Sequence, residues 1–143
     1  SLPVNVDLPL AVGIPADYIS DQDLRLRLYR RIADLRDETE LDALGSEFRD
    51  RFGQLPEMTQ NLLYQMRVKL RAEKAGLISV NMESSGQILL KVAGSNEGTE
   101  SKRLPDLGSG IRGGKSAYWV TVAKDESWTV KLLDVLKLLD GKS

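Results

Sequence analysis

The sequence predicts an α+β fold: an N-terminal extended arm, a three-helix segment, a small antiparallel sheet and a closing C-terminal helix. Three observations predict this class. Apolar residues recur at helical spacing through residues 20–76, short β-type runs replace that pattern after Gly76, and helical spacing returns near the C-terminus. The chain has 143 residues, of which 41% are hydrophobic and 29% charged. This is a globular composition, and the length predicts a single domain over residues 1–143.

Residues 1–19 are predicted to form the extended arm. Apolar side chains alternate with other residues in its first half, at Val4, Val6, Leu8 and Leu10. Prolines occur along the whole arm, at Pro3, Pro9 and Pro15. Because proline cannot donate a hydrogen bond to a neighbouring strand, the arm is expected at the edge of the sheet.

The first predicted helix begins near Ser20 or Asp21. Ser20 and Asp23 have the spacing of a capping box, and an acidic first turn suits the helix dipole. The helix would bury one apolar stripe, made of Leu24, Leu28, Ile32 and Leu35.

Two further helices complete the three-helix segment, residues 20–76. The second is expected to start after Thr39, with Asp42 in its first turn, and to end at Gly53. Its stripe is Leu41, Leu44, Phe48 and Phe52. The third is expected from about Pro56 to Ala75, because proline suits a first helical turn and Gly76 follows. Its inward residues would be Leu62, Leu63, Met66 and Leu70.

Residues 77–143 are predicted to contain the small sheet and the last helix. Two apolar runs flank the turn sequence at residues 83–86, which predicts a β-hairpin. Residues 93–114 are rich in Gly and Ser and are expected to be a long loop, with a tight turn at Gly113-Gly114. A third strand is expected around residues 118–122, and an amphipathic helix from Asp125 to Leu139.

Composition excludes several chemistries. The chain has no cysteine and no histidine, so disulfides, thiolate sites and His-based triads cannot be built from it. The formal net charge is −1 and both halves are balanced, which argues against direct binding to nucleic acid. Acidic pairs lie at helix starts, where capping explains them. No apolar run is long enough to span a membrane, and the lack of cysteine is consistent with a cytoplasmic protein.

The glycine-rich stretch at residues 108–116 offers an alternative function. Its end, Gly113-Gly114-Lys115-Ser116, is similar to a phosphate-binding loop, which would make the chain a nucleotide-binding enzyme. Two features oppose this interpretation. Ser109 stands where the motif needs glycine, and the stretch leads into β-type sequence rather than a helix. Trp119 and Trp128 could stack on bases, but their positions favour core packing.

The second helix carries a charged face that composition does not explain. At 100° per residue, Glu47, Asp50 and Arg51 fall on one face beside the Phe48 stripe, together with Glu40 and Ala43. Glu47 and Arg51 are four residues apart and could pair with each other. The alternative is a docking face, on which these charges meet opposite charges of a partner.

Four sequence motifs, in order and spacing, resemble the C-terminal domain of bacterial transcription-repair coupling factors. They are Ile14-Pro15-Ala16-Asp17-Tyr18-Ile19, Leu28-Tyr29-Arg30-Arg31-Ile32-Ala33, Asp50-Arg51-Phe52-Gly53-Gln54-Leu55-Pro56 and Asn61-Leu62-Leu63. The resemblance covers residues 4–77 well and the rest loosely. Longer members have a helix where this chain has the loop at 93–114.

The resemblance implies a non-catalytic regulatory domain without a cofactor or metal. The parent would be an ATP-dependent DNA translocase that acts on stalled RNA polymerase and recruits the nucleotide-excision machinery, with its motor motifs upstream. The domain would pack on the excinuclease-B-like module of the same chain and mask its binding surface for the excinuclease A subunit. The family's contact positions correspond to Glu47, Asp50 and Arg51. The start at Ser1, without a methionine, is typical of a fragment.

Overall fold

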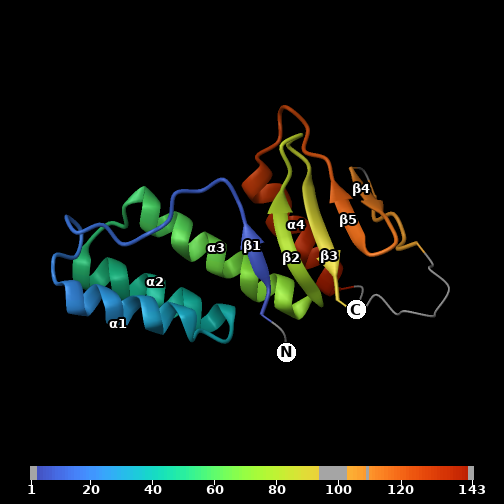
Figure 1. The fold of residues 1–143 in the computed structure, drawn as a ribbon. Coiled ribbons are helices and arrows are strands. Elements are labelled where there is room, and N and C mark those ends of the chain that lie inside the picture. Colours follow the sequence, from blue (N-terminus) through green and yellow to red (C-terminus); the bar gives the residue numbers. More distant parts are fainter. Residues whose placement is uncertain (1–2, 94–102, 109, 142–143) are drawn as a thin grey trace. The chain divides into compact units, whose positions relative to one another are not determined.

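A computed structural model describes residues 3–93, 103–108 and 110–141 and confirms the predicted α+β class (Figure 1). The chain forms two compact units. The helical unit comprises residues 10–70, and the sheet unit combines residues 1–9 with residues 71–143. The boundary falls inside the third helix, so the predicted three-helix segment contributes to both units.

The helical unit contains α1 (Gln22–Ala33), α2 (Glu38–Phe52) and most of α3 (Glu57–Lys74). The predicted apolar stripes of all three helices meet in one core. Phe48 is completely buried at its centre. The other buried members are Ile14, Ile19, Leu28, Ile32, Leu41, Leu44, Leu55, Met66 and Leu70.

Two helix starts differ from their predictions by one or two residues. The cap of α1 is Asp21 rather than Ser20: Asp21 Oδ1 accepts hydrogen bonds from the backbone N–H groups of Asp23 and Leu24, at 3.0 and 3.2 Å. Helix α2 begins at Glu38 rather than after Thr39, because Asp37 Oδ1 accepts from the Glu40 N–H at 2.8 Å. In both cases a carboxylate next to the first turn satisfies free N–H groups and opposes the helix dipole.

The second half of the predicted arm is part of the helical unit rather than of the sheet edge. The Gly13 N–H donates to the Met58 carbonyl at 3.2 Å, and the buried Thr59 hydroxyl donates to the Gly13 carbonyl at 2.9 Å. The Tyr29 hydroxyl accepts from the Ile14 N–H at 2.6 Å. These hydrogen bonds satisfy backbone N–H and C=O groups that would otherwise pair with a neighbouring strand, so residues 10–19 need no strand partner.

The sheet unit contains one five-stranded sheet within the described part of the chain. Its order is β1 (Asn5–Asp7), β2 (Leu77–Met82), β3 (Ile88–Val92), β5 (Ala117–Val120) and β4 (Ile111–Gly113). The predicted hairpin is the β2–β3 pair. The arm strand β1 lies at an edge, as its prolines predict, but it runs parallel to β2, so the sheet is mixed rather than wholly antiparallel.

Helix α4 (Trp128–Asp140) covers one face of this sheet (Figure 1). It begins three residues later than predicted, with Ser127 as its cap. The face toward α4 supplies the core of the sheet unit, which includes Val80, Ile88, Leu90, Val120, Leu132 and Leu136.

Strand β4 lies in the region predicted to be a loop. Residues 94–102 and Ser109 of that predicted loop are outside the described residues. Ile111–Gly113 pairs with β5, and the predicted tight turn follows, closed by a bond from the Gly114 N–H to the Ala117 carbonyl. Three residues between glycines are too few for an alternating pattern, so pairing with a distant strand decides their structure.

Candidate functional site

The end of α2 that carries the predicted site is held in place by Tyr18. The Tyr18 hydroxyl donates to the Gly53 carbonyl at 2.9 Å and lies 3.3 Å from the Phe48 carbonyl oxygen. The rings of Tyr18 and Phe48 each meet the Phe52 ring edge-on, with centroids 6.0 Å apart. Burial raises the pKa of Tyr18, so its hydroxyl keeps its proton and remains a donor.

Glu47 binds two arginines from two helices. Arg31 of α1 donates from Nη1 and Nη2 to the two oxygens of the carboxylate, at 2.8 and 2.7 Å. Arg51 Nη1 donates to Oε2 at 2.8 Å, and the Arg51 guanidinium also lies 4.8 Å from the centre of the Phe52 ring. The hydrogen bonds from Arg31 and then Arg51 lower the pKa of Glu47 from 4.5 to about 2, so the carboxylate is charged at neutral pH.

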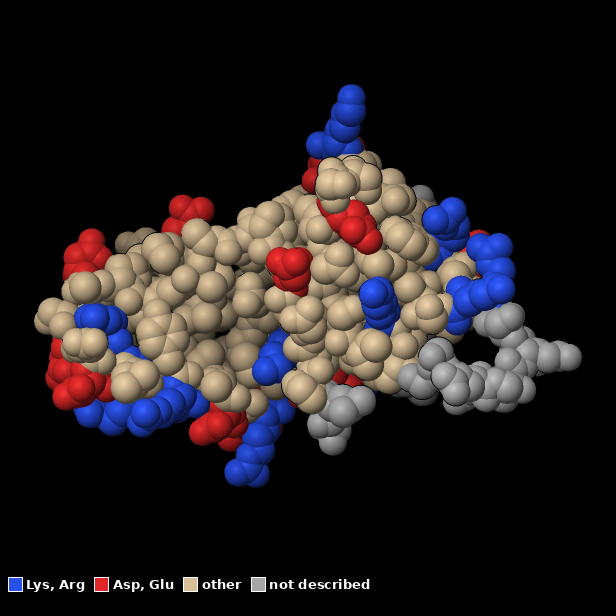
Figure 2. Space-filling model, in the orientation of Figure 1, with Lys and Arg blue, Asp and Glu red and all other residues tan. Residues whose placement is uncertain are grey.

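All three predicted site residues lie at the surface. The side chain of Glu47 is 29% exposed and that of Arg51 is 47% exposed. Asp50 is exposed and forms no ion pair or side-chain hydrogen bond with another residue in the described ranges. Basic and acidic side chains gather along the edge of the helical unit formed by α1 (Figure 2). This surface can therefore present both signs of charge to a partner.

Arg31 belongs to this cluster and was not predicted to do so. It lies off the apolar stripe of α1, where an exposed arginine is ordinary, and its side chain is 49% exposed. The sequence signal available was its place in the second family-like motif, Leu28–Ala33. We call Arg31, Glu47, Asp50 and Arg51 the α2 charged cluster.

The glycine-rich stretch does not have the geometry of a phosphate loop. Apart from Ser109, which is outside the described residues, it forms β4, a turn and the approach to β5. A phosphate loop leads into a helix whose first N–H groups point at the anion, and β5 is a strand. The alternative function therefore has no structural support in these residues.

Residues 3–93, 103–108 and 110–141 contain neither a candidate metal site nor a candidate membrane span. No group of three or more acidic side chains is arranged there to hold a metal ion. No helix in those ranges has the length and apolar character needed to cross a membrane.

Comparison with known proteins identifies related sequences. A family model described as the TRCF domain matches residues 8–102. Proteins named transcription-repair-coupling factor match in Rickettsia bellii (38% identity over 84 residues), Mycobacterium tuberculosis (36% over 87) and Escherichia coli K12 (34% over 84). These alignments cover 59%, 61% and 59% of this chain but only 8%, 7% and 7% of the respective relatives.

A solved structure has the same fold. The crystal structure of a C-terminal domain of transcription-repair coupling factor matches with a TM-score of 0.69 and 20% identity. The match covers 99% of this chain and 92% of that one. The likeness thus extends through the second half of the chain, where the sequence resemblance is loose.

Proposed function

Because the chain belongs to the TRCF domain family and has the fold of a transcription-repair coupling factor C-terminal domain, we propose that it is a non-catalytic regulatory domain of such a factor. The domain packs on the excinuclease-B-like module of the same parent chain and masks the surface for the excinuclease A subunit. ATP hydrolysis, DNA translocation and the action on stalled RNA polymerase belong to other parts of the parent.

The observation that carries this proposal is the exposure of the α2 charged cluster on a fixed scaffold. Asp50 is exposed, and Arg31 and Arg51 each keep about half of their side-chain surface accessible. Glu47 orients both arginines, and the Tyr18 bond fixes the backbone where α2 ends. Charges held in one geometry lose little conformational entropy on binding, which favours recognition by a complementary partner.

The polar character of the cluster also suits a contact that must open. Contacts between domains of one chain are commonly modest in area and more polar than permanent interfaces. Tethering in one chain raises the effective concentration, so a weak intrinsic affinity is sufficient. A change elsewhere in the parent that disfavours the closed state would then release the module.

Binding in trans tests the proposal. The 143-residue chain is titrated with the isolated excinuclease-B-like module, and Kd is measured for the wild type and for the double charge reversal Asp50→Arg/Arg51→Asp. We expect the double variant to bind at least about tenfold more weakly, because like charges then face each other across the contact. Its midpoint of thermal unfolding should stay close to that of the wild type, since both side chains are exposed.

Asp134→Arg/Lys137→Asp is the matched control. Both residues are exposed on α4 and form no ion pair with another described residue, so this swap keeps the net charge unchanged, as Asp50→Arg/Arg51→Asp does, and leaves the cluster intact. Equal loss of affinity in this control, or unfolding of the double variant, would contradict the assigned site.

A further inference from the structure

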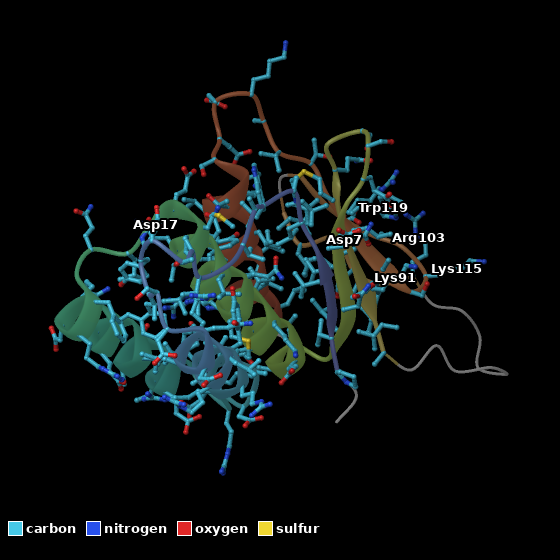
Figure 3. The ribbon with its side chains drawn as sticks, turned by 60° about the vertical axis from the view of Figure 1, so that its left-hand side comes forward. Asp7, Asp17, Lys91, Arg103, Lys115 and Trp119 are labelled. Atoms are coloured by element: carbon cyan, nitrogen blue, oxygen red, sulfur yellow. The ribbon has the colours of Figure 1, made fainter. Side chains whose placement is uncertain are left out.

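One face of the sheet is left uncovered by α4. Alternation along the strands places Asn81, Leu89, Trp119 and Arg112 in one row across β2, β3, β5 and β4 on this face. Their neighbours along the strands, such as Val80, Leu90 and Val120, are buried toward α4. Figure 3 shows Trp119, Lys91, Arg103 and Lys115 projecting from the same side of the sheet, with Asp7 at its β1 end.

Trp119 is the aromatic residue at the centre of this face. The sequence predicted instead that it packs in the core. Its side chain is partly exposed, and it stands directly opposite the buried Leu89 in the β3–β5 register. The Arg112 guanidinium lies 6.0 Å from the centre of the Trp119 ring. The indole offers a flat surface on which a base can stack, and the neighbouring guanidinium offers a positive charge for a phosphate.

A shallow pocket of about 360 Å³ adjoins the ring. Trp119, Arg112 and Thr121 line it together with the backbone of Gly108 and Gly110, which lie in the glycine-rich stretch. Asp106 also lines the pocket, and its Oδ1 accepts a hydrogen bond from the Gly113 N–H at 2.8 Å. This carboxylate therefore serves to hold β4.

The local charge of the face is basic although the chain as a whole is balanced. Lys91, Arg112 and Lys115 are exposed and form no ion pair with another residue in the described ranges. Arg103 adds a further positive charge while its Nη2 donates to the Gly113 carbonyl at 3.0 Å. Asp7 is the acidic residue in the strands of this face. An anionic chain can thus lie along the face with its charges compensated.

We propose that this sheet face, opposite α4, binds single-stranded nucleic acid, with a base on Trp119 and phosphates at Arg112, Lys115 and Lys91. A protein partner fits less well. Leu89 and Ala117 are buried and Trp119 is only partly exposed, while the large exposed apolar side chain in the described strands is Ile78, at the irregularity of β2, so the face offers few apolar anchors to a protein. Strand addition at β4 is blocked, because Leu104 and Asp106 already bond to Gly114 and Gly113.

Fluorescence anisotropy of a labelled 20-nucleotide oligo(dT) with the 143-residue chain, at 20–200 mM salt, tests the proposal. We expect saturable binding that weakens with salt. The double variant Lys91→Gln/Arg112→Gln should lower the affinity at least about fivefold and reduce the slope of log K against log salt by about 1.4, because two phosphate contacts are lost. Trp119→Ala should also weaken binding, through lost stacking.

Arg27→Gln/Arg30→Gln removes two exposed arginines from α1 and is the matched control. The proposal is overturned if wild-type chain does not bind at 20 mM salt, or if this control loses as much affinity as the sheet variant. Equal competition by poly-glutamate or by duplex DNA would also overturn it, since stacking would then have no part. Asp50→Arg/Arg51→Asp should bind as wild type, which separates this test from that of the proposed function.

Discussion

Glu47 is a surface carboxylate whose environment is set by two arginines. Exposed ion pairs contribute little to stability, commonly below about 1 kcal/mol, because water and salt screen them. The bidentate geometry with Arg31 and the second bond from Arg51 make this pair better organised than most. The residue links α1 to α2 and orients the side chains around it.

The lowered pKa of Glu47 predicts a pH-dependent contribution to folding. The carboxyl has a pKa of about 2 when folded and 4.5 ordinarily, so its contribution is complete above about pH 4.5 and is progressively lost as the pH falls through 2. Urea unfolding should show wild type more stable than Glu47→Gln by less than about 1 kcal/mol at pH 7. At pH 2, where about half of the folded carboxyls are protonated, the difference should be much smaller than at pH 7. A difference that grows on acidification would contradict the ion pairing.

Removing one arginine should change the titration of Glu47 itself. In Arg31→Gln the carboxylate loses the arginine whose hydrogen bonds lower its pKa most, so the pKa of Glu47 should rise toward the ordinary range. NMR titration of the Glu47 side chain measures this directly. Arg49→Gln, a neighbour on α2 that bonds Ser46 instead, should leave the Glu47 pKa in place.

At the scale of elements, the motif around Gly53 joins the arm to the end of α2. Gly53 has φ of 89°, which glycine adopts without strain, and the chain turns there into Leu55 and α3. Tyr18 comes from a different motif, yet its hydroxyl bonds the Gly53 carbonyl. The spacing of these two motifs therefore reflects one tertiary contact.

Tyr18→Phe isolates that contact. It removes the hydroxyl but keeps the ring against Phe52, so unfolding free energy should fall by about 1 kcal/mol. Chemical denaturation measures the loss. Binding to the excinuclease-B-like module should weaken as well, because the end of α2 loses an anchor; a variant with wild-type stability would show that the bond adds nothing.

Gly45 and Gly113 should respond oppositely to alanine. Gly45 lies inside α2, where a Cβ would make ordinary contacts at 3.7 and 3.8 Å, so Gly45→Ala should stabilise the chain by about 0.5–1 kcal/mol. At Gly113 a Cβ would overlap the Leu104 carbonyl oxygen, which belongs to backbone. Gly113→Ala should therefore displace β4 and destabilise the chain by more than about 1 kcal/mol. Thermal unfolding should show a higher midpoint than wild type for Gly45→Ala and a lower one for Gly113→Ala.

At the scale of the whole molecule, the proposed function predicts inhibition. The 143-residue chain, added in trans, should compete with the excinuclease A subunit for the excinuclease-B-like module, because both would cover the same surface. A competition assay should show the wild-type chain displacing the subunit, and Asp50→Arg/Arg51→Asp should need at least about tenfold more protein. A complex that holds the chain, the excinuclease-B-like module and the excinuclease A subunit together would contradict masking. It would not contradict direct binding of the chain to the module.

Much of the fold could be predicted because periodicity reports burial along a single element. The stripes of α1, α2 and α3, the β2–β3 hairpin and α4 all follow from repeats of 3.6 or 2 residues. The observed helix starts differ from the predicted ones because neighbouring Ser, Asp and Thr residues can all serve as the N-cap of a helix. The parallel pairing of β1 and the existence of β4 could not be predicted, since three-residue strands carry too little pattern.

Periodicity and motifs are enough to predict the α+β class, the family resemblance and the position of Glu47, Asp50 and Arg51 on one helix face. The tertiary structure decided what those residues meet: Arg31 from α1 on Glu47, and Tyr18 at the end of α2. It also decided that Trp119 lies beside Arg112 on the sheet face opposite α4. The physical reason is that a local repeat records which side of an element is buried, whereas contacts between elements depend on how distant segments are brought together.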